Sequence, residues 1–178
     1  LKESGLSWIA NFRAEFVDPE TLLRLQEAGC RWLYFGLEAA DDERRSRVKK
    51  GLRTDQIERA VRCLAATGIG TVYSVIYGLP LDETEDDLGR CLDFVDRLHA
   101  MHPSAEIQVQ SFVPLPGTEL YEVAKRHGFI PPATLAGWAR HDHFRIRNPW
   151  LSEPALGRKL YLYSFLAFRY RRHLSGFP

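Results

Sequence analysis

The stretch Trp32-Leu33-Tyr34-Phe35-Gly36-Leu37-Glu38-Ala39 is a short apolar and aromatic run that ends in a single carboxylate. A continuous apolar run of this length, bounded by polar or turn residues, is typical of a buried strand. Glu38 would then lie at the carboxyl end of that strand, where α/β proteins place their ligand sites. Similar runs end in Gly or Pro turns at Tyr73–Pro80 and Ile107–Gly117. We expect the three strand ends to open on the same side and to carry the function.

Helix signals separate these strands. Asp18 followed by Pro19 predicts a helix start, and Gly29 predicts its end. Strands are expected over Ser7–Arg13, Trp32–Glu38, Thr71–Tyr77 and Glu106–Val113, and helices from Asp18, over Asp41–Lys50, and from Thr54, Thr84 and Thr118. Strands that alternate with single helices predict βαβ units and a parallel sheet. Four such repeats make half of a (β/α)₈ barrel or most of a doubly wound sheet.

The chain changes character after Pro131-Pro132, where tryptophan, tyrosine and phenylalanine become frequent. Pro154–Leu174 is predicted to be a long helix with a wide apolar and aromatic face. We therefore expect two parts, an α/β part over residues 1–130 and a helical extension over 131–178 that packs on a neighbouring surface.

The composition is that of an ordinary globular chain of 178 residues with a formal net charge of +1. This charge gives no general attraction to nucleic acid or to an anionic membrane. No apolar run approaches the roughly 20 residues that span a bilayer. The chain begins at Leu1 and not at Met, so we expect it to be part of a longer protein.

Three widely spaced cysteines, Cys30, Cys63 and Cys91, argue against a disulfide framework and for a reducing, cytoplasmic location. They are expected to be buried thiols, because none has a second cysteine at metal-ligand spacing. His141 and His143 flank Asp142, and a solvated loop is the simpler interpretation of that cluster.

Polar residues close the predicted strands. Arg13, Glu38, Gly78 and Gln110 should meet at one rim, where they could grip a ligand that carries an amine, a carboxylate or a ribose diol. The alternative is an Arg13–Glu38 ion pair that only seals the rim. A carboxylate that follows five apolar residues needs a partner, and none is evident nearby in the sequence. The basic pairs Arg44-Arg45 and Lys49-Lys50 are typical of a solvated helix face.

Two strand exits are rich in Gly and Pro, Gly78-Leu79-Pro80 and Pro114-Leu115-Pro116-Gly117. Gly permits close backbone approach and Pro sets the direction of the exit. A purely structural turn remains the alternative at both places. Neither exit matches a phosphate-binding GxGxxG or Walker loop, and the GxSxG nucleophile elbow is absent from the sequence.

The ordered set of motifs resembles the radical S-adenosylmethionine (radical SAM) superfamily over residues 7 to 128. The motifs are Arg13–Glu20, Glu27–Cys30, Tyr34–Glu38, Lys49–Gly51, Ala66–Ile69, Val75–Pro80 and Pro114–Tyr121. The aromatic tail, with Trp138 and Asn148-Pro149-Trp150-Leu151, is similar to the subgroup that often carries an upstream cobalamin-binding domain.

The resemblance implies a partial (β/α)₆ barrel in which a CxxxCxxC loop binds a 4Fe–4S cluster and the cluster binds S-adenosylmethionine. Reductive cleavage of that cofactor gives a 5′-deoxyadenosyl radical. This sequence contains neither CxxxCxxC nor the Gly-Gly-Glu strand of the family. We therefore expect the last four β/α units of the barrel and the extension, without metal ligands and inactive alone.

The resemblance also implies which residues approach the cofactor. Glu38, at the end of the fourth family strand, would help to hold its polar parts, and Arg13 would reach the methionyl or ribose groups. The fifth strand would lie along the adenine and the sixth near the adenine and substrate, through Val75, Ile76, Gly78 and Pro80, and through Gln110 and Pro114, respectively.

The sequence leaves three hypotheses about function. The first is the C-terminal part of a radical SAM enzyme, a methyltransferase or cyclase, with cobalamin left open. Its substrate would be a small molecule or a peptide, and its partners the missing half of the barrel or a second copy at exposed strand edges. The second is a non-catalytic α/β binding or scaffold module. The third is a different barrel enzyme that uses Glu38 as acid or base and Arg13 as an anion clamp.

Overall fold

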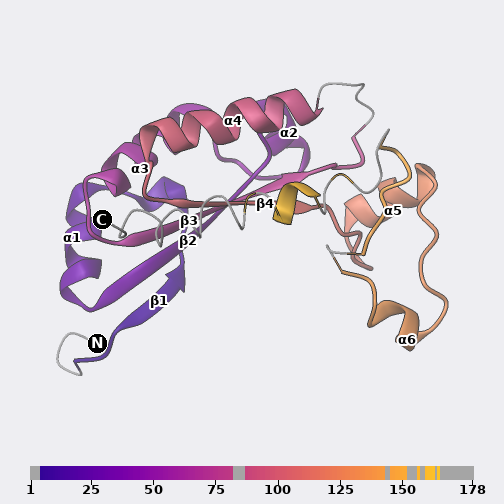
Figure 1. The fold of residues 1–178 in the computed structure, drawn as a ribbon, viewed down its shortest axis with the longest axis horizontal. Helices are drawn as coiled ribbons and strands as arrows, with labels where there is room; N and C mark the ends of the chain where they lie inside the picture. The colour runs from indigo at the N-terminus through magenta and orange to yellow at the C-terminus, as the bar shows by residue number, and fades with distance from the viewer. Residues whose placement is uncertain are drawn as a thin grey trace, which may run out of the picture.

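Four parallel strands form one sheet in the order β1-β2-β3-β4 (Figure 1). The computed structural model describes residues 5–81, 87–142, 145–151, 156, 159–162 and 164. The strands are β1 (Trp8–Asn11), β2 (Cys30–Glu38), β3 (Gly70–Tyr77) and β4 (Glu106–Ser111). The helices are η2 (Ala14–Phe16, a 3₁₀ turn), α1 (Pro19–Glu27), α2 (Asp42–Arg47), α3 (Thr54–Ala65), α4 (Asp87–Met101), α5 (Glu119–Arg126) and α6 (Leu135–Trp138). The predicted α/β fold with a parallel sheet is confirmed.

Local signals explain where most of these helices begin and end. The Asp18 carboxylate accepts a hydrogen bond from the backbone N–H of Thr21 at 2.9 Å, and Gly29 leaves α1 with a φ of +92°. Thr118 caps α5 in the same way, through the N–H of Tyr121 at 3.2 Å. The expected start at Thr84 lies outside the described residues, which resume at Asp87.

Two predicted helix boundaries were wrong. The helix expected over Asp41–Lys50 ends at Arg47, because Lys49 takes a left-handed φ of +59° that an α-helix cannot accommodate. Thr54 does not cap α3. Arg53 precedes the helix, and its backbone N–H is satisfied by the side-chain oxygen of Gln56 at 2.8 Å.

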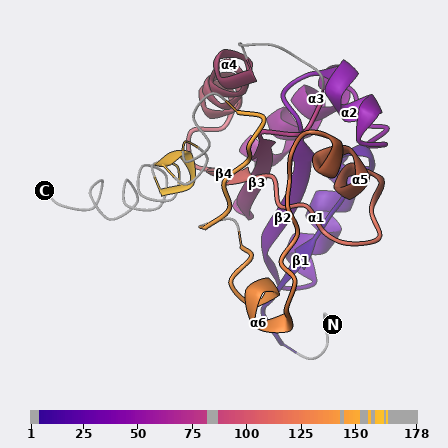
Figure 2. The same cartoon turned by 90° about the vertical axis from the view of Figure 1, so that its right-hand side faces the viewer.

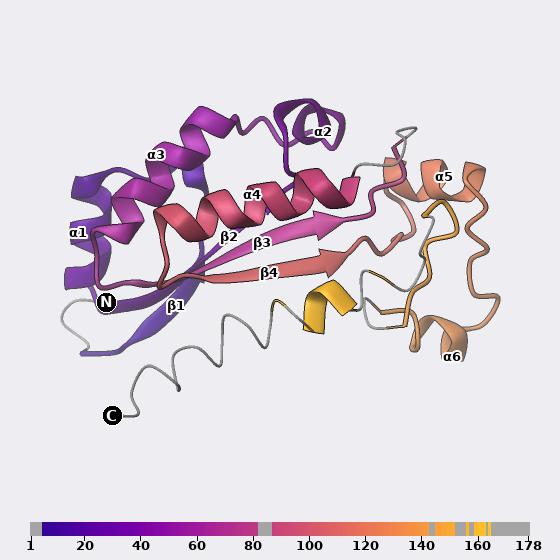
Figure 3. The same cartoon turned by 45° about the horizontal axis from the view of Figure 1, so that its top comes forward.

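The main core lies between one face of the sheet and helices α3 and α4, which run along that face (Figures 1 and 3). Alternate residues of each strand point into it, as the period of two requires. The buried side chains include Leu33, Phe35 and Leu37 of β2, Tyr73 and Val75 of β3, Ile107 and Val109 of β4, and Phe94 and Leu98 of α4.

The opposite face of the sheet is only partly covered. Many of its residues are exposed or half-buried, among them Tyr34, Gly36 and Glu38 of β2, Ser74 and Ile76 of β3, and Gln108 and Gln110 of β4. Parallel sheets are normally covered on both faces. The open face is therefore where a further structural layer or a ligand would lie.

A second apolar cluster lies beyond the carboxyl ends of the strands, where α5 and α6 are found (Figures 1 and 2). It joins Phe112 and Ala124 to Ile146 and Trp150, so it combines residues from both sides of position 130.

The last described residues of the C-terminal extension, 156, 159–162 and 164, lie along the β4 edge of the sheet (Figure 3). The backbone N–H of Val109 donates to Ser164 Oγ at 3.1 Å, and Leu156 and Leu160 pack against the main core. Most of the predicted helix over Pro154–Leu174 lies outside the described residues. Among the helices that the structure does describe, none is both long and apolar enough to cross a membrane.

Candidate functional site

Glu38 lies on a β-bulge at the end of β2. The register with β3 shifts between Gly36 and Glu38, and Glu38 has a φ of +65°. A left-handed conformation is uncommon for a residue other than glycine, and such strain concentrates at functional sites. Glu38 Oε1 accepts a hydrogen bond from Lys50 Nζ at 3.1 Å, and the two side chains are 27% and 28% exposed.

This pair corrects the expected partner of Glu38. The alternative of an Arg13–Glu38 ion pair is wrong, and so is the placing of Lys50 on a solvated helix face. Lys50 follows α2, and the bend at Lys49 brings it back over the end of β2.

Gly36 provides the space for the pair. A Cβ at this position would lie 2.5 Å from Glu38 Oε1 and 3.5 Å from Lys50 Nζ. The carboxylate and the ammonium therefore lie over Gly36, on the open face of the sheet.

Arg13 does not contact Glu38. Its guanidinium is 64% exposed and forms an ion pair with Glu15. The hydrogen bond from Arg13 lowers the pKa of Glu15, as does the nearby charge of Lys50, although burial opposes both. Arg13, Glu15, Lys50 and Glu38 thus form a row of alternating charges, in which Glu15 is a member that the sequence did not single out.

The end of β3 is held by side chains from distant parts of the chain. Gly78 has a φ of +78°, its N–H donates to Asp87 Oδ2 at 3.1 Å, and its carbonyl accepts from Trp150 Nε1 at 3.0 Å. Asn148 Nδ2 lies 3.5 Å from the same carbonyl and 3.2 Å from that of Phe112. The contacts of Asn148 and Trp150 with Gly78 could not be predicted from the sequence, because they join residues about seventy positions apart.

The other residues expected on β3 and β4 divide between the two faces. Ile76 and Gln110 are register partners, and both are half-buried on the open face. Val75 is fully buried in the main core, so its side chain faces away from the open face. Pro80 and Pro114 are buried beyond the strand ends.

His141 is part of this same end of the molecule. Its Nε2 lies 3.1 Å from the carbonyl oxygen of Pro114, and its ring packs against Trp138 and Phe129 at centroid distances of 5.0 and 5.2 Å. The expected solvated loop is therefore wrong for His141. His143 lies outside the described residues.

Arg44 and Arg45 are buried, contrary to the expected solvated helix face. Arg44 Nη1 donates to Asp41 Oδ2 at 2.6 Å, and Arg44 Nε lies 3.2 Å from Asp87 Oδ1. The other oxygen of Asp87, Oδ2, accepts from the N–H of Gly78. Burial raises the pKa of Asp41, but hydrogen bonds from Arg44 outweigh this effect and lower it. Arg44 thus connects α2 to the exit of β3.

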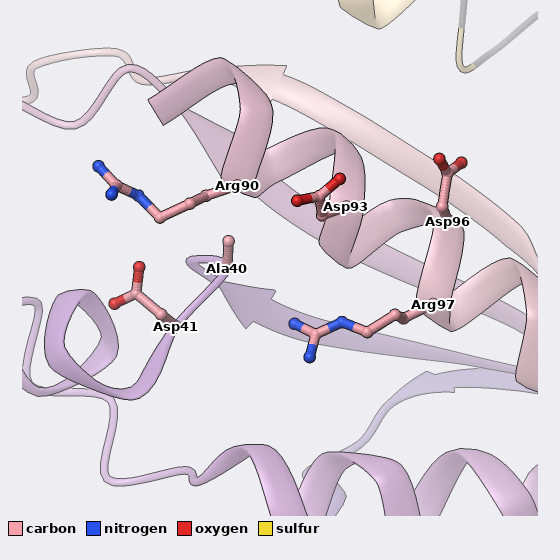
Figure 4. Close-up of a pocket in the computed structure, with 6 residues that line it drawn as sticks. All are labelled: Ala40, Asp41, Arg90, Asp93, Asp96 and Arg97. Carbon is pink, nitrogen blue, oxygen red and sulfur yellow. The ribbon is translucent and has the colours of Figure 1, made fainter. Parts of the chain in front are cut away.

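A cleft of about 610 Å³ lies on the helical side of the sheet, between the residues that follow β2 and the outer face of α4 (Figure 4). Charges of both signs line it, with Asp41 on one side and four charged residues of α4 on the other, namely Arg90, Asp93, Asp96 and Arg97. None of the eight residues expected to approach the cofactor lines this cleft.

The three cysteines do not form a metal site. Cys30 and Cys91 are each 2% exposed, and burial raises the pKa of Cys91 to about 12. Among the residues that the structure describes, no group of three or more His, Cys, Asp or Glu side chains could hold a metal ion. These residues therefore do not fit an iron–sulfur cluster.

Comparison with known proteins supports the resemblance. Residues 9–95 match the model of the radical SAM superfamily. An uncharacterized methyltransferase from Pyrococcus horikoshii is 30% identical over 126 residues, which are 70% of this chain and 26% of that protein. The bacteriochlorophyllide d C-8(2)-methyltransferase of Chlorobaculum tepidum is 23% identical over 149 residues, 82% of this chain and 31% of that protein. The chain thus spans between a quarter and a third of the length of these relatives.

A solved structure shows the same fold. The radical S-adenosylmethionine methyltransferase TsrM from Kitasatospora setae, solved with cobalamin and a [4Fe-4S] cluster bound, aligns with a TM-score of 0.55 and 24% identity. The alignment covers 72% of this chain and 25% of TsrM. The parallel sheet, the ordered motifs and the match over residues 9–95 together confirm the predicted resemblance to the radical SAM superfamily.

Proposed function

We propose that this chain is the C-terminal part of the barrel of a radical SAM methyltransferase, and that the open face of its sheet forms one side of the S-adenosylmethionine site. The observation that carries the proposal is the position of Glu38. It is a strained, half-buried carboxylate on the open face, at the carboxyl end of a strand inside the matched region.

The residues of this face fit the cofactor. S-adenosylmethionine carries an ammonium group, a carboxylate and a ribose diol, and the Glu38–Lys50 pair presents charges of both signs to such groups. Ile76 offers an apolar surface for a flat ring, and Gln110 beside it offers an amide that can donate and accept hydrogen bonds.

The chemistry of the reaction would come from groups that this chain does not bind by itself. When bound, the cluster and S-adenosylmethionine together supply a 5′-deoxyadenosyl radical or a transferable methyl group. The chain's own residues would hold and orient the cofactor and shield it from water. The methyltransferase assignment is supported by the relatives named above, and cobalamin as a further cofactor is supported by the TsrM structure.

The experiment begins upstream of Leu1. The same reading frame should encode a CxxxCxxC motif, and the polypeptide that contains both should incorporate one 4Fe–4S cluster after anaerobic reconstitution. It should then bind and cleave S-adenosylmethionine. Stoichiometric cluster incorporation by residues 1–178 alone, with cleavage of the cofactor, would contradict this division of the site.

The role of Glu38 is tested in the same polypeptide. Glu38→Gln keeps the shape of the side chain but removes its charge, so we expect the dissociation constant for S-adenosylmethionine to rise by about tenfold, the loss expected for a charge-assisted hydrogen bond. Glu58→Gln, on the outer helix α3, is the matched control and should leave it unchanged. Equal affinities of the two variants for S-adenosylmethionine would show that Glu38 is not part of the binding site.

A non-catalytic binding or scaffold module is the second candidate. It is favoured by one observation, that the Glu38 carboxylate already has a cationic partner in Lys50. A start codon at the position of Leu1, with no cluster motif in the native frame, would support it. The third reading, with Arg13 as an anion clamp beside Glu38, lost its main support because Arg13 pairs with Glu15.

A further inference from the structure

Both polar backbone groups of Gly78, in the turn after β3, form hydrogen bonds with side chains. The N–H of Gly78 donates to the carboxylate of Asp87, and the carbonyl of Gly78 accepts from the indole N–H of Trp150. Asp87 is in turn fixed by the buried guanidinium of Arg44. The backbone of Gly78 is therefore restrained from α4 on one side and from the C-terminal extension on the other.

Asn148 connects this turn to the exit of β4. The residue is 2% exposed, and its Nδ2 faces the carbonyls of Gly78 and Phe112. Only the NH₂ end of the amide can face two acceptors, so the orientation of the side chain is determined. Asn148 Oδ1 then points away, and no residue within the described ranges gives it a hydrogen bond.

A buried acceptor without a partner is unfavourable, and an apolar side chain would avoid it. The choice of Asn therefore indicates that the two N–H donors matter at this place. Close packing supports the same conclusion. A Cβ on Gly78 would lie 2.8 Å from Leu151 Cδ1 and 3.3 Å from Asn148 Nδ2, so the segment is pressed directly against the glycine.

We propose that the segment Asn148–Leu151 is a positioning element of the cofactor site, which fixes the turn Gly78-Leu79-Pro80 and the relative position of the β3 and β4 exits. This inference rests on the proposed function, because that turn continues the strand whose Ile76 faces the open side beside Gln110. The segment contacts the backbone directly after β3 and β4, at Gly78 and Phe112, so its role is to hold the adenosyl side of the site in place.

The test compares two tryptophans of the same extension. Trp150→Phe removes the donor to Gly78 and keeps an aromatic ring. Trp138→Phe is the control, because the Trp138 ring packs against Tyr121 and His141, away from the Gly78 carbonyl. Both variants are made in the reconstituted full-length polypeptide, and unfolding midpoints are measured to show that both remain folded.

We expect Trp150→Phe to raise the dissociation constant for S-adenosylmethionine by about fivefold, the equivalent of one lost hydrogen bond, and Trp138→Phe to change it by less than about twofold. Hydrogen–deuterium exchange of the peptide that contains residues 76–81 should be faster in Trp150→Phe only. Asn148→Leu, which removes both donors and keeps a similar volume, should enlarge both effects.

The outcomes separate this inference from the proposed function. Equal affinities and equal exchange in the two tryptophan variants would overturn the positioning role even if the wild type binds the cofactor. If the wild type binds no S-adenosylmethionine, the proposed function fails and the link to a cofactor site fails with it. The exchange comparison then still decides whether Trp150 holds the turn.

Discussion

At the scale of single residues, Gly36 leaves the space that the Glu38–Lys50 pair occupies. A methyl group at this position would meet the carboxylate end of Glu38, which is flexible and can swing aside. A methyl group on Gly70 would instead lie 2.4 Å from the indole ring of Trp32, and the rigid ring would have to move as a whole to make room.

We therefore predict that Gly36→Ala leaves the free energy of unfolding within about 1 kcal/mol of wild type, while Gly70→Ala lowers it by about 1–3 kcal/mol. Despite its stability, Gly36→Ala should weaken cofactor binding, because the Glu38–Lys50 pair is displaced. Denaturant unfolding and a binding titration measure the two effects. Strong destabilisation by Gly36→Ala would show that the ion pair is rigid.

Arg45 is unusual because its charged side chain is completely buried. Its guanidinium donates to the carbonyls of Leu52 and Ala39 at 2.9 and 2.6 Å, pairs with Asp42, and lies over the ring of Phe94. It therefore satisfies backbone groups in the loops on both sides of α2.

Arg45→Met should lower the free energy of unfolding by about 3–5 kcal/mol, because two buried carbonyls lose their donor and Asp42 loses its cationic partner. Arg59→Met, at an exposed position of α3, is the matched control and should cost less than about 0.5 kcal/mol. Thermal or urea unfolding measures the loss of stability in the two variants. Similar values would mean that water replaces the guanidinium at the buried site.

At the scale of elements, helix α2 is held in place by contacts that its first turn makes with the start of α3. Asp42 accepts hydrogen bonds from both the backbone N–H and the hydroxyl of Thr54, each at 2.7 Å. The Thr54 hydroxyl and then Arg45 lower the pKa of Asp42. The carboxylate thus joins the start of α2 to the start of α3.

This lowered pKa predicts how stability depends on pH. A carboxyl group with a lower pKa in the folded state stabilises fully above its unfolded pKa of about 3.9, and loses this contribution as the pH falls through the folded value. The difference in unfolding free energy between wild type and Asp42→Asn should therefore shrink as the pH falls from 5 toward 2. Denaturant unfolding at several pH values measures it, and a constant difference would contradict the assignment.

At the scale of the whole molecule, the sheet is covered by helices on one face and has exposed side chains on the other. Ile9 of the edge strand β1 is 61% exposed, and Tyr34 of the neighbouring strand β2 is 36% exposed. Apolar residues on an open face and a free strand edge favour association with another chain.

We predict that residues 1–178 alone self-associate, with a molar mass in light scattering that increases with protein concentration. Ile9→Lys places a charge on the edge strand and should shift the equilibrium toward monomer. Leu135→Lys, at an exposed position of α6 beyond the strand ends, is the control and should not. A wild-type monomer at all concentrations would show that the open face and edge do not bind another copy.

The sequence by itself determined the parallel α/β fold, the β2 strand with Glu38 at its end, and the caps at Asp18 and Thr118. These features are encoded locally, in hydrophobic period and in residues that satisfy the first backbone N–H groups of a helix. Only the tertiary structure decided that Lys50 pairs with Glu38, that Arg45 is buried, and that Trp150 binds the Gly78 carbonyl. Each of these depends on bends and crossovers that bring distant residues together, and the spacing of residues along the chain does not record which side chains will meet.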